Sequence, residues 1–298
     1  YRPKRQSKIT KLFFKDYYKT KRIIINKTIS MAYTETTTTT YGQRVKKSFG
    51  GIGSGILLFI VGTILLWWNE GRAVKTTKML NEAAGVTVEM TDIGTIDPQF
   101  DGKLVHATGM TATIDSLIDS DFGVGVTAVK FNRKVEYYQW VENSKSQTKD
   151  KIGGGQETVT TYTYEKKWVN SPVASENFHD PEYQGANRIR IAIDDLRQTA
   201  ENVSFGAYRL TKSQISSISG DQPYVFSEKD SERISNELFK EECQVDTTLT
   251  VKVQSNVISF GSNSGTPQVG DVRVTFTKVL PGEVSLMAQV SGDTFVPF

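Results

Sequence analysis

The sequence predicts a membrane-anchored α+β protein, in which one transmembrane helix precedes a mainly antiparallel β domain with a few helices. Two observations predict this class. Residues 48–69 contain no charged side chain, and most of the chain after them alternates apolar and polar residues with the period of two of a half-buried strand. The chain therefore divides into a basic and Thr-rich disordered tail at 1–47, a transmembrane helix at 48–69 and a β-rich extramembrane domain at 70–298.

The predicted tail combines two compositions. Residues 1–30 contain ten Lys or Arg and one acidic residue, a net charge of +9; the whole chain carries +3, which leaves −6 for residues 31–298. A basic arm can bind nucleic acid or an anionic membrane, but we favour the alternative that Met31 is the true start and that the preceding segment is translated upstream sequence. Residues 31–43 have few large apolar side chains, so we expect disorder there. We also expect the sequence to be a fragment at both ends.

The uncharged stretch is long enough to cross a bilayer. As a helix, residues 48–69 extend ~33 Å, about the thickness of one hydrocarbon core. Indole rings prefer the headgroup layer and charged groups prefer water, so the exit of the span forms an interface anchor and juxtamembrane motif. This motif consists of Trp67, Trp68, Asn69, Glu70, Gly71 and Arg72. We further expect Glu70 and Arg72 to clamp the emerging helix to the folded domain.

Three glycines give the span a packing face. Gly51 and Gly55 form a GxxxG pair, and Gly62 lies seven residues further along the same face. Because small residues let two helix backbones approach closely, we expect a partner helix, in the same protein or in a second copy. A cleaved signal peptide, which would leave a soluble secreted domain starting near Val74, is the alternative; the run is long for a signal peptide, and Arg72 lies inside the cleavage site.

The domain after the span shows strand patterns more often than helix patterns. A short helix is expected over 73–84, ending at Gly85, followed by strands at 86–90 and 104–113. A long hairpin with a floppy polar tip is expected from strands at 127–142 and 158–169. The later elements are a short strand at 189–193, a helix from Ser227 with Asp230 in its capping box, a strand at 247–258 and a closing hairpin of 271–279 with 283–290.

No motif of a known catalytic or metal site occurs in the sequence. G-x-S-x-G, the P-loop, G-x-G-x-x-G and H-E-x-x-H are all missing, so we predict no enzyme, catalytic residue, metal or cofactor. The single Cys243 excludes an intramolecular disulfide, and the two histidines, His106 and His179, provide no zinc pattern. The nearest acid–base candidates are His179 and Asp180 with Glu182, and the pair Asp194 and Asp195, which we interpret as solvated loop charges.

Two further features have simple interpretations. The domain is acidic, so we expect no nucleic-acid partner, and the hairpin aromatics are interpreted as cross-strand packing rather than as a stacking platform. These aromatics are Tyr137, Tyr138, Trp140, Tyr162, Tyr164 and Trp168. Asn202 and Ser204 form a glycosylation sequon, which has meaning only in a eukaryotic lumen.

Several motifs in the same order resemble the LUMA family of transmembrane proteins, also called transmembrane protein 43. The resemblance starts with LLFIVGTILLWWNEGRAVKT and continues through GKLVHATG and DSDFGVGVTAVKFNRKVEYYQWVE. It returns in VGDVRVTF and SGDTFVPF, so it covers about 49–298 with a weak middle third. The chain departs from the family in its Thr-rich tail, in that middle third and in an insert at 153–155.

The resemblance implies a polytopic membrane protein with a large β-rich domain between a first span and further carboxy-terminal spans. In eukaryotes it implies the endoplasmic reticulum and inner nuclear membrane, a lumenal domain, and lamins and emerin as partners. Bacterial relatives lack such partners and would lie in the cell inner membrane. The short tail and the missing eukaryotic targeting pattern favour a bacterial-type member.

The resulting prediction is a non-enzymatic integral membrane protein that organises or scaffolds membrane components through its extracytoplasmic or lumenal domain. The alternative is a membrane-tethered hydrolase or ligand-binding protein. A cleft in which His106 or His179 meets a carboxylate and a hydroxyl would favour the alternative.

Overall fold

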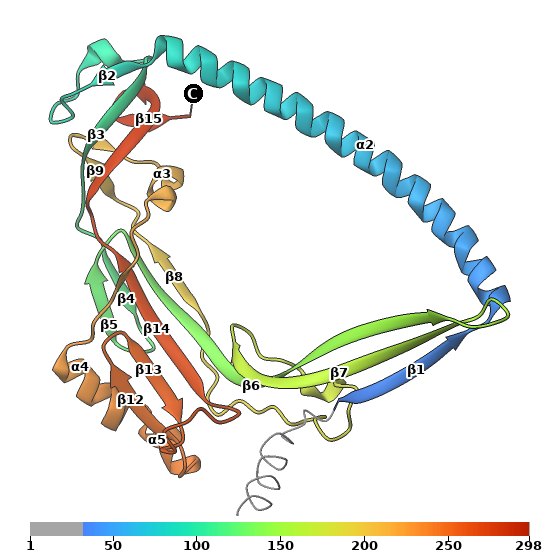
Figure 1. The fold of residues 1–298 in the computed structure, drawn as a ribbon. Helices are drawn as coiled ribbons and strands as arrows, with labels where there is room; N and C mark the ends of the chain where they lie inside the picture. The colour runs from blue at the N-terminus through green and yellow to red at the C-terminus, as the bar shows by residue number, and fades with distance from the viewer. Residues whose placement is uncertain (1–31, 298) are drawn as a thin grey trace, which may run out of the picture. The chain divides into compact units, whose positions relative to one another are not determined.

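The computed structural model describes residues 32–297 and divides into two compact units (Figure 1). Unit 1 comprises residues 32–47, Trp140–Lys166 and Ala174–Ala186. Unit 2 comprises Ser48–Gln139, Lys167–Val173 and 187–297. The predicted basic segment 1–30 lies outside the described residues. The predicted class is confirmed: a long apolar helix precedes a mostly antiparallel β domain with a few short helices.

The Thr-rich segment is a strand, so the prediction of a disordered tail is wrong from residue 33 onward. Strand β1 (Tyr33–Thr39) pairs antiparallel with β7 (Gln156–Val169), placing Tyr33 opposite Tyr162 and Thr39 opposite Gln156. Threonine is β-branched and suits an extended backbone, and an edge strand needs little apolar surface when its backbone groups are paired. Composition alone predicted disorder, because it contains no information about the partner strand β7. That strand lies more than 100 residues away in the sequence.

Helix α2 (Tyr41–Val86) is 46 residues long and is much longer than the predicted span at 48–69. It includes the short helix that the sequence placed after the span, and Gly85 lies within its last turn. At 1.5 Å per residue the helix reaches ~69 Å, about twice the thickness of a hydrocarbon core. A bilayer can therefore contain only part of α2.

In unit 1, β6 (Lys130–Asp150) and β7 form the predicted long hairpin, and β1 extends it at the edge of β7. The tip is a compact turn rather than a floppy loop, because the amide of Lys151 donates to Gly155 O at 2.8 Å. The loop 174–186, with the 3-10 turn η2 (Ser175–Asn177), packs its rings on the hairpin. Tyr183 stacks on Tyr164 at 4.1 Å and meets Trp140 edge-on at 4.9 Å. The aromatic rings of the hairpin thus pack against other side chains. Some of these belong to loop 174–186, whose position the sequence patterns did not predict.

One sheet of unit 2 joins the first part of β6 to β14 (Val272–Val279), which pairs with β13 (Val257–Gly261) and through it with β12 (Thr250–Gln254). Strand β8 (Leu196–Thr199) also pairs with β6, and β11 (Gln222–Pro223) pairs with β14. The alternation predicted for β6 is confirmed, because Phe131 is fully buried and Val135 and Tyr137, which are in phase with it, lie in the same core. The centre of this core is Phe122, Phe131, Phe260 and Phe276.

A second sheet surrounds a separate core. Its path runs β15 (Glu283–Ser291), β16 (Thr294–Val296), β10 (Tyr208–Arg209), β9 (Val203–Phe205), β3 (Leu104–Thr113) and β2 (Val88–Met90). Because β15 also pairs with β3, the pairings close into a ring. Phe205, Tyr208 and Phe295 lie inside with no exposed surface.

The remaining elements are short. They are η1 (Pro98–Phe100), the hairpin β4 (Ser116–Asp119) and β5 (Val124–Thr127), α3 (Lys212–Ser217), α4 (Glu228–Arg233), a π-helical stretch Ile234–Leu238 and α5 (Lys240–Val245). The predicted helix start is confirmed: Ser227 caps α4 and its Oγ accepts from the amide of Asp230 at 3.1 Å.

Three strand predictions are wrong, one because no strand forms and two because the pairing differs. Residues 189–193 form no strand, although Ile191 is buried. The single strand predicted over 247–258 is the hairpin β12–β13, with a turn at Ser255 and Asn256. The closing hairpin does not form, because β14 pairs within the first sheet and β15 within the ring, so the chain changes sheets at Pro281 and Gly282. Strand patterns indicate which faces are buried, but they do not specify the partner strand.

Candidate functional site

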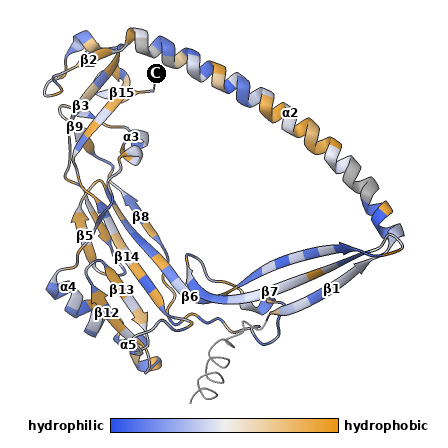
Figure 2. Cartoon of the chain, viewed as in Figure 1, coloured by the Kyte–Doolittle hydropathy of each residue, from blue (hydrophilic) through white to orange (hydrophobic). Residues whose placement is uncertain are grey.

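Helix α2 carries the principal candidate site, an apolar stretch whose described side chains are largely exposed. By length and composition, Gly53–Met79 is the one helix of residues 32–297 that could cross a membrane. Figure 2 shows the hydrophobic residues concentrated in the middle of α2. Phe59 is 76% exposed and Trp67 is 80% exposed, which confirms the expectation that the side chains of this stretch do not pack into the domain. Removing each such side chain from water is worth about 1.5–3 kcal/mol, so this surface favours an apolar environment such as a bilayer or other helices.

The glycines of the predicted packing face leave room for a close neighbour. A Cβ built at Gly55 or Gly62 meets nothing within 4 Å, so neither glycine is required by contacts within the described chain. Gly51 also lies in α2, but its surroundings are outside what the structure describes. Association with another helix remains a prediction for all three.

The juxtamembrane motif continues as helix rather than ending it. Trp67, Trp68, Asn69, Glu70, Gly71 and Arg72 are all exposed on α2. Within residues 32–297 no hydrogen bond or ion pair joins Glu70 or Arg72 to a strand, so the clamp hypothesis has no support. Gly71 does not break the helix, because a glycine costs only about 1 kcal/mol inside one.

His106 contacts both a carboxylate and a hydroxyl. Its Nδ1 lies 2.8 Å from Glu89 Oε2 on β2, and its Nε2 lies 2.8 Å from Ser285 Oγ on β15. This is the order of groups in a serine hydrolase triad. The side chains of His106 and Glu89 are 36% and 61% exposed, whereas Ser285 lies in the wall of a cavity between α3 and β15. The hydrolase alternative expected these groups to meet in a cleft, and here His106 and Glu89 meet at a solvent-exposed position.

His179 lies in unit 1 and pairs with Glu142 rather than acting with Asp180 and Glu182. Its Nδ1 is 2.9 Å from Glu142 Oε1, and its ring stacks on Tyr162 at 3.9 Å. The Tyr164 hydroxyl donates to the other Glu142 oxygen at 2.6 Å. Burial opposes ionisation of Glu142, but the bonds from Tyr164 and His179 lower its pKa overall, whereas burial and the neighbouring carboxylate raise the pKa of Tyr164. Tyr164 is held in its neutral form, and the His179 ring is stacked on Tyr162. These contacts anchor loop 174–186 to the hairpin.

The second acid–base candidate has a structural role. Asp195 Oδ1 accepts the amide of Val135 at 2.7 Å, and the carbonyl of Asp194 accepts from Arg133 Nε at 2.9 Å. Both residues therefore tie the loop before β8 to β6. Both are exposed loop residues, as the sequence indicated, but their bonds to a distant strand could not be predicted from local patterns.

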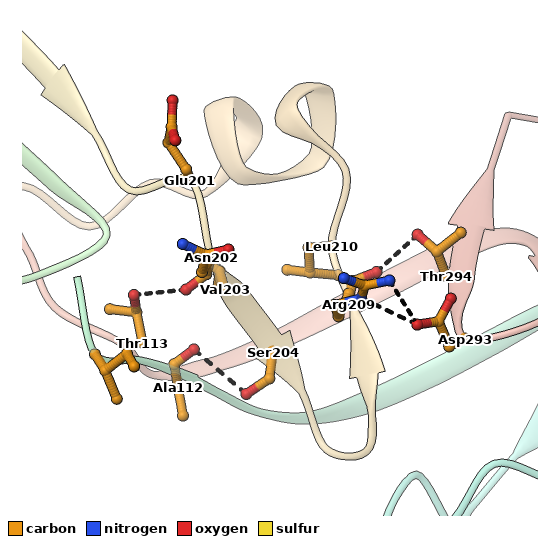
Figure 3. Close-up of a pocket in the computed structure, with 11 residues that line it drawn as sticks. Ala112, Thr113, Glu201, Asn202, Val203, Ser204, Arg209, Leu210, Asp293 and Thr294 are labelled. Carbon is orange, nitrogen blue, oxygen red and sulfur yellow. Dashed lines mark hydrogen bonds and ion pairs between the residues drawn. The ribbon is translucent and has the colours of Figure 1, made fainter.

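A cavity of about 460 Å³ lies beside the start of β9 (Figure 3). Its hydroxyls already bond the backbone: Thr113 Oγ1 donates to Asn202 O at 2.6 Å, and Thr294 Oγ1 donates to Arg209 O at 2.9 Å. At the rim Arg209 pairs with Asp293 at 2.8 Å. A second cavity of about 470 Å³ lies between α3 and β15. Neither cavity is lined by a histidine, but Ser285, which contacts His106, lines the second.

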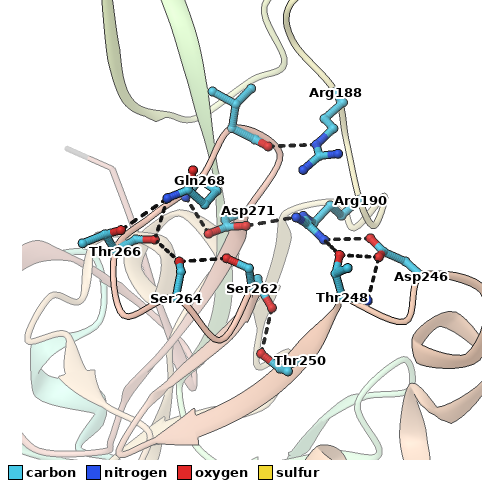
Figure 4. Close-up of polar contacts among 12 residues, drawn as sticks. Arg188, Arg190, Asp246, Thr248, Thr250, Ser262, Ser264, Thr266, Gln268 and Asp271 are labelled. Atoms are coloured by element: carbon cyan, nitrogen blue, oxygen red, sulfur yellow. Dashed lines mark hydrogen bonds and ion pairs between the residues drawn. The ribbon is translucent and has the colours of Figure 1, made fainter.

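A buried polar cluster holds the loop 187–195 to α5 and β14 (Figure 4). Arg190 donates to Asp246 Oδ2 at 2.7 Å and to Thr248 Oγ1 at 2.8 Å, and its Nε lies 3.4 Å from Asp271. Bonds from Thr248, together with Arg190, lower the pKa of Asp246. A Cβ on Gly261 would lie 2.7 Å from Asp271 Cγ, so a glycine is needed where β13 passes this carboxylate. The contacts of the cluster are internal to the domain, and they fix the fold.

Comparison with known proteins supports the membrane interpretation. Transmembrane protein 43 of Rattus norvegicus and that of Homo sapiens are each 30% identical over 268 residues, which is 86% of this chain and 62% of each relative. The Transmembrane protein 43 homolog of Drosophila melanogaster is 28% identical over 253 residues, which is 82% of this chain and 61% of the relative. The chain thus spans about three fifths of the length of these relatives. No solved structure matches the chain.

The family described as Transmembrane protein 43 matches residues 137–298, which is more than half of the chain. The match covers most of the hairpin and the carboxy-terminal strands of both sheets, and the relatives extend the similarity toward the apolar helix. The exposed apolar helix and the β domain agree with the membrane protein that these names indicate. The chain belongs to the transmembrane protein 43 family.

Proposed function

We propose that this chain is a non-enzymatic membrane protein that organises other membrane components, with α2 as its anchor and the β domain as its scaffold. The exposed apolar middle of α2 carries the proposal, because it requires lipid or other helices around it. The solvent exposure of His106 and Glu89 favours this proposal over a hydrolase, because a hydrolase site works best when water is excluded. The partners we propose are the bilayer and further transmembrane helices, either of the same protein or of a second copy.

Association through the glycine face is tested by filling it. Gly55→Leu combined with Gly62→Leu is expected to weaken helix association by about tenfold, because close backbone approach is lost. The matched control is Gly53→Leu, which lies on the opposite side of α2; a Cβ at Gly53, Gly55 or Gly62 meets nothing within 4 Å, so none of the changes strains the chain itself. The measurement is the size of the complex in mild detergent. Equal complexes in the double variant and the control would contradict the proposed packing face.

We also propose that the β domain lies on the extracytoplasmic or lumenal side, in the endoplasmic reticulum and inner nuclear membrane of a eukaryotic host or the inner membrane of a bacterial one. Glycosylation of the sequon at Asn202 reports on which side of the membrane the β domain lies. Asn202 is exposed and its Nδ2 donates to Asp115 Oδ1 at 3.1 Å. Synthesis with microsomes is expected to add a glycosidase-sensitive glycan that Asn202→Gln removes. A chain that is membrane-integrated, unglycosylated and digested by external protease would place the domain on the cytoplasmic side.

A further inference from the structure

Strand β1 and the first turn of α2 are attached to the hairpin of unit 1. Thr36 lies opposite Val159 in the β1–β7 register, and the Tyr33 and Tyr162 rings lie 6.1 Å apart. Arg44 Nη1 donates to Gly154 O at 2.8 Å and lies 3.1 Å from Asp150 Oδ1. The segment before the apolar stretch of α2 is therefore held by the tip of a hairpin that follows the stretch in the chain.

The order of the chain makes this attachment incompatible with a membrane crossing. Residues 32–47 precede the candidate span Gly53–Met79, and residues 140–166 follow it. Within residues 32–297 no second helix is long and apolar enough to return the chain across a bilayer. If α2 crosses once, Arg44 lies on one side of the membrane and Gly154 on the other.

We infer that docking of β1 on β7 and membrane insertion of α2 are mutually exclusive, so that the chain has two arrangements. In one, β1 covers the edge of β7 and α2 does not span. In the other, α2 spans, β1 is on the opposite side of the membrane, and the β7 edge from Gln156 to Tyr162 is open. This inference rests on the proposed membrane anchor and adds a conformational change to it.

The contacts of β1 indicate that it is the part that leaves. Every residue from Tyr33 to Thr38 is exposed, and the side-chain bonds that hold the strand are long: Thr37 Oγ1 to Thr158 O is 3.5 Å and Tyr162 Oη to Glu35 Oε2 is 3.5 Å. The hairpin cannot follow the helix into the bilayer, because its tip carries Lys149 and Lys151 and an open sheet has unpaired backbone groups at its edges.

A cysteine pair distinguishes the two arrangements. In a Cys243→Ser background, Thr36→Cys with Val159→Cys is expected to cross-link in chain made without lipid, since the two residues are direct partners. In chain made with sealed microsomes the cross-link is expected to fall by about tenfold or more. The matched control is Thr148→Cys with Thr158→Cys, whose hydroxyls are 2.9 Å apart within the hairpin. This pair should cross-link equally with and without membranes.

Labelling from each side of the vesicle gives a second test that does not need lipid-free chain. With a membrane-impermeant maleimide, the single variants Thr36→Cys and Val159→Cys are expected to react from opposite sides of sealed vesicles. If both react from the same side while the chain resists carbonate extraction, the inference is wrong and α2 enters the bilayer without crossing it. If both react from the same side and carbonate releases the chain, the membrane anchor itself is wrong. An undiminished cross-link in the Thr36→Cys, Val159→Cys double variant, in chain that resists carbonate, would also overturn the inference.

Discussion

Ile60→Arg combined with Leu65→Arg is expected to release the full chain from the membrane pellet into the carbonate-soluble fraction. Both side chains lie in the exposed apolar part of α2. An arginine near the centre of a span costs about 2.5–3.5 kcal/mol, so two together oppose insertion strongly. The measurement is the fraction of chain that remains in the membrane pellet after carbonate extraction.

Val74→Arg is the control for this variant, because it adds a charge to the same helix beyond the two tryptophans. Val74 is 58% exposed and lies close to Arg72 and Lys75, where a further charge would face water or headgroups. It should leave the chain in the pellet. If the double arginine variant also stays in the pellet, α2 is not the anchor.

Arg133→Met is expected to produce the largest loss of stability among single substitutions in unit 2. The Arg133 guanidinium is buried against Asp119 at 2.8 Å, reaches Asp121 at 2.7 Å and lies over the Phe122 ring. Removing one partner of a buried ion pair leaves the other charge unpaired, which costs about 3–5 kcal/mol. Thermal unfolding in detergent should shift down by about 10 °C. Lys134→Met, at the neighbouring position on the exposed face of β6, should change the free energy of unfolding by less than about 0.5 kcal/mol.

The deficit of Arg133→Met should depend on pH. Burial already raises the pKa of Asp119, and Arg133 opposes that rise. Without Arg133 the folded-state pKa rises further above the unfolded value, so the folded variant binds a proton more tightly than the unfolded chain does. The loss in free energy of unfolding, relative to the wild type, is therefore largest at high pH. It becomes smaller as the pH falls through the raised pKa of Asp119. A loss that is the same at pH values well above and well below that raised pKa would show that Asp119 is not the group left unpaired.

Local patterns were sufficient to predict the helix and the strand faces. The uncharged run at 48–69 predicts a span because no polar face interrupts it, and the alternation around Phe131 and Val135 predicts the buried side of β6. The cap at Ser227 is also local, since hydroxyl and amide lie three residues apart. In each case the deciding interaction lies within a few residues or depends only on solvent.

The rest depends on partners that are distant in the sequence. β1 lies 123 residues before its partner, with Thr36 opposite Val159, so composition alone indicated disorder. Arg133 is in phase with the buried residues of β6, but only the carboxylates of Asp119 and Asp121 make its burial acceptable. His106 contacts Glu89 and Ser285 only because three strands from different parts of the chain lie side by side. No local spacing of residues predicts these contacts.

The change of sheets at Pro281 and Gly282 constrains how the domain is made. β14 completes the first sheet through β6, pairing Val272 with Tyr137, and β15 closes the ring through β3, pairing Glu283 with Met110. Neither core can close during synthesis until residues 272–291 have left the ribosome. The growing chain must therefore carry β3 and β6 with unpaired edges until these residues have been made, and such edges are prone to aggregate. We expect folding after release of these last strands, with dependence on chaperones of the compartment that receives the domain.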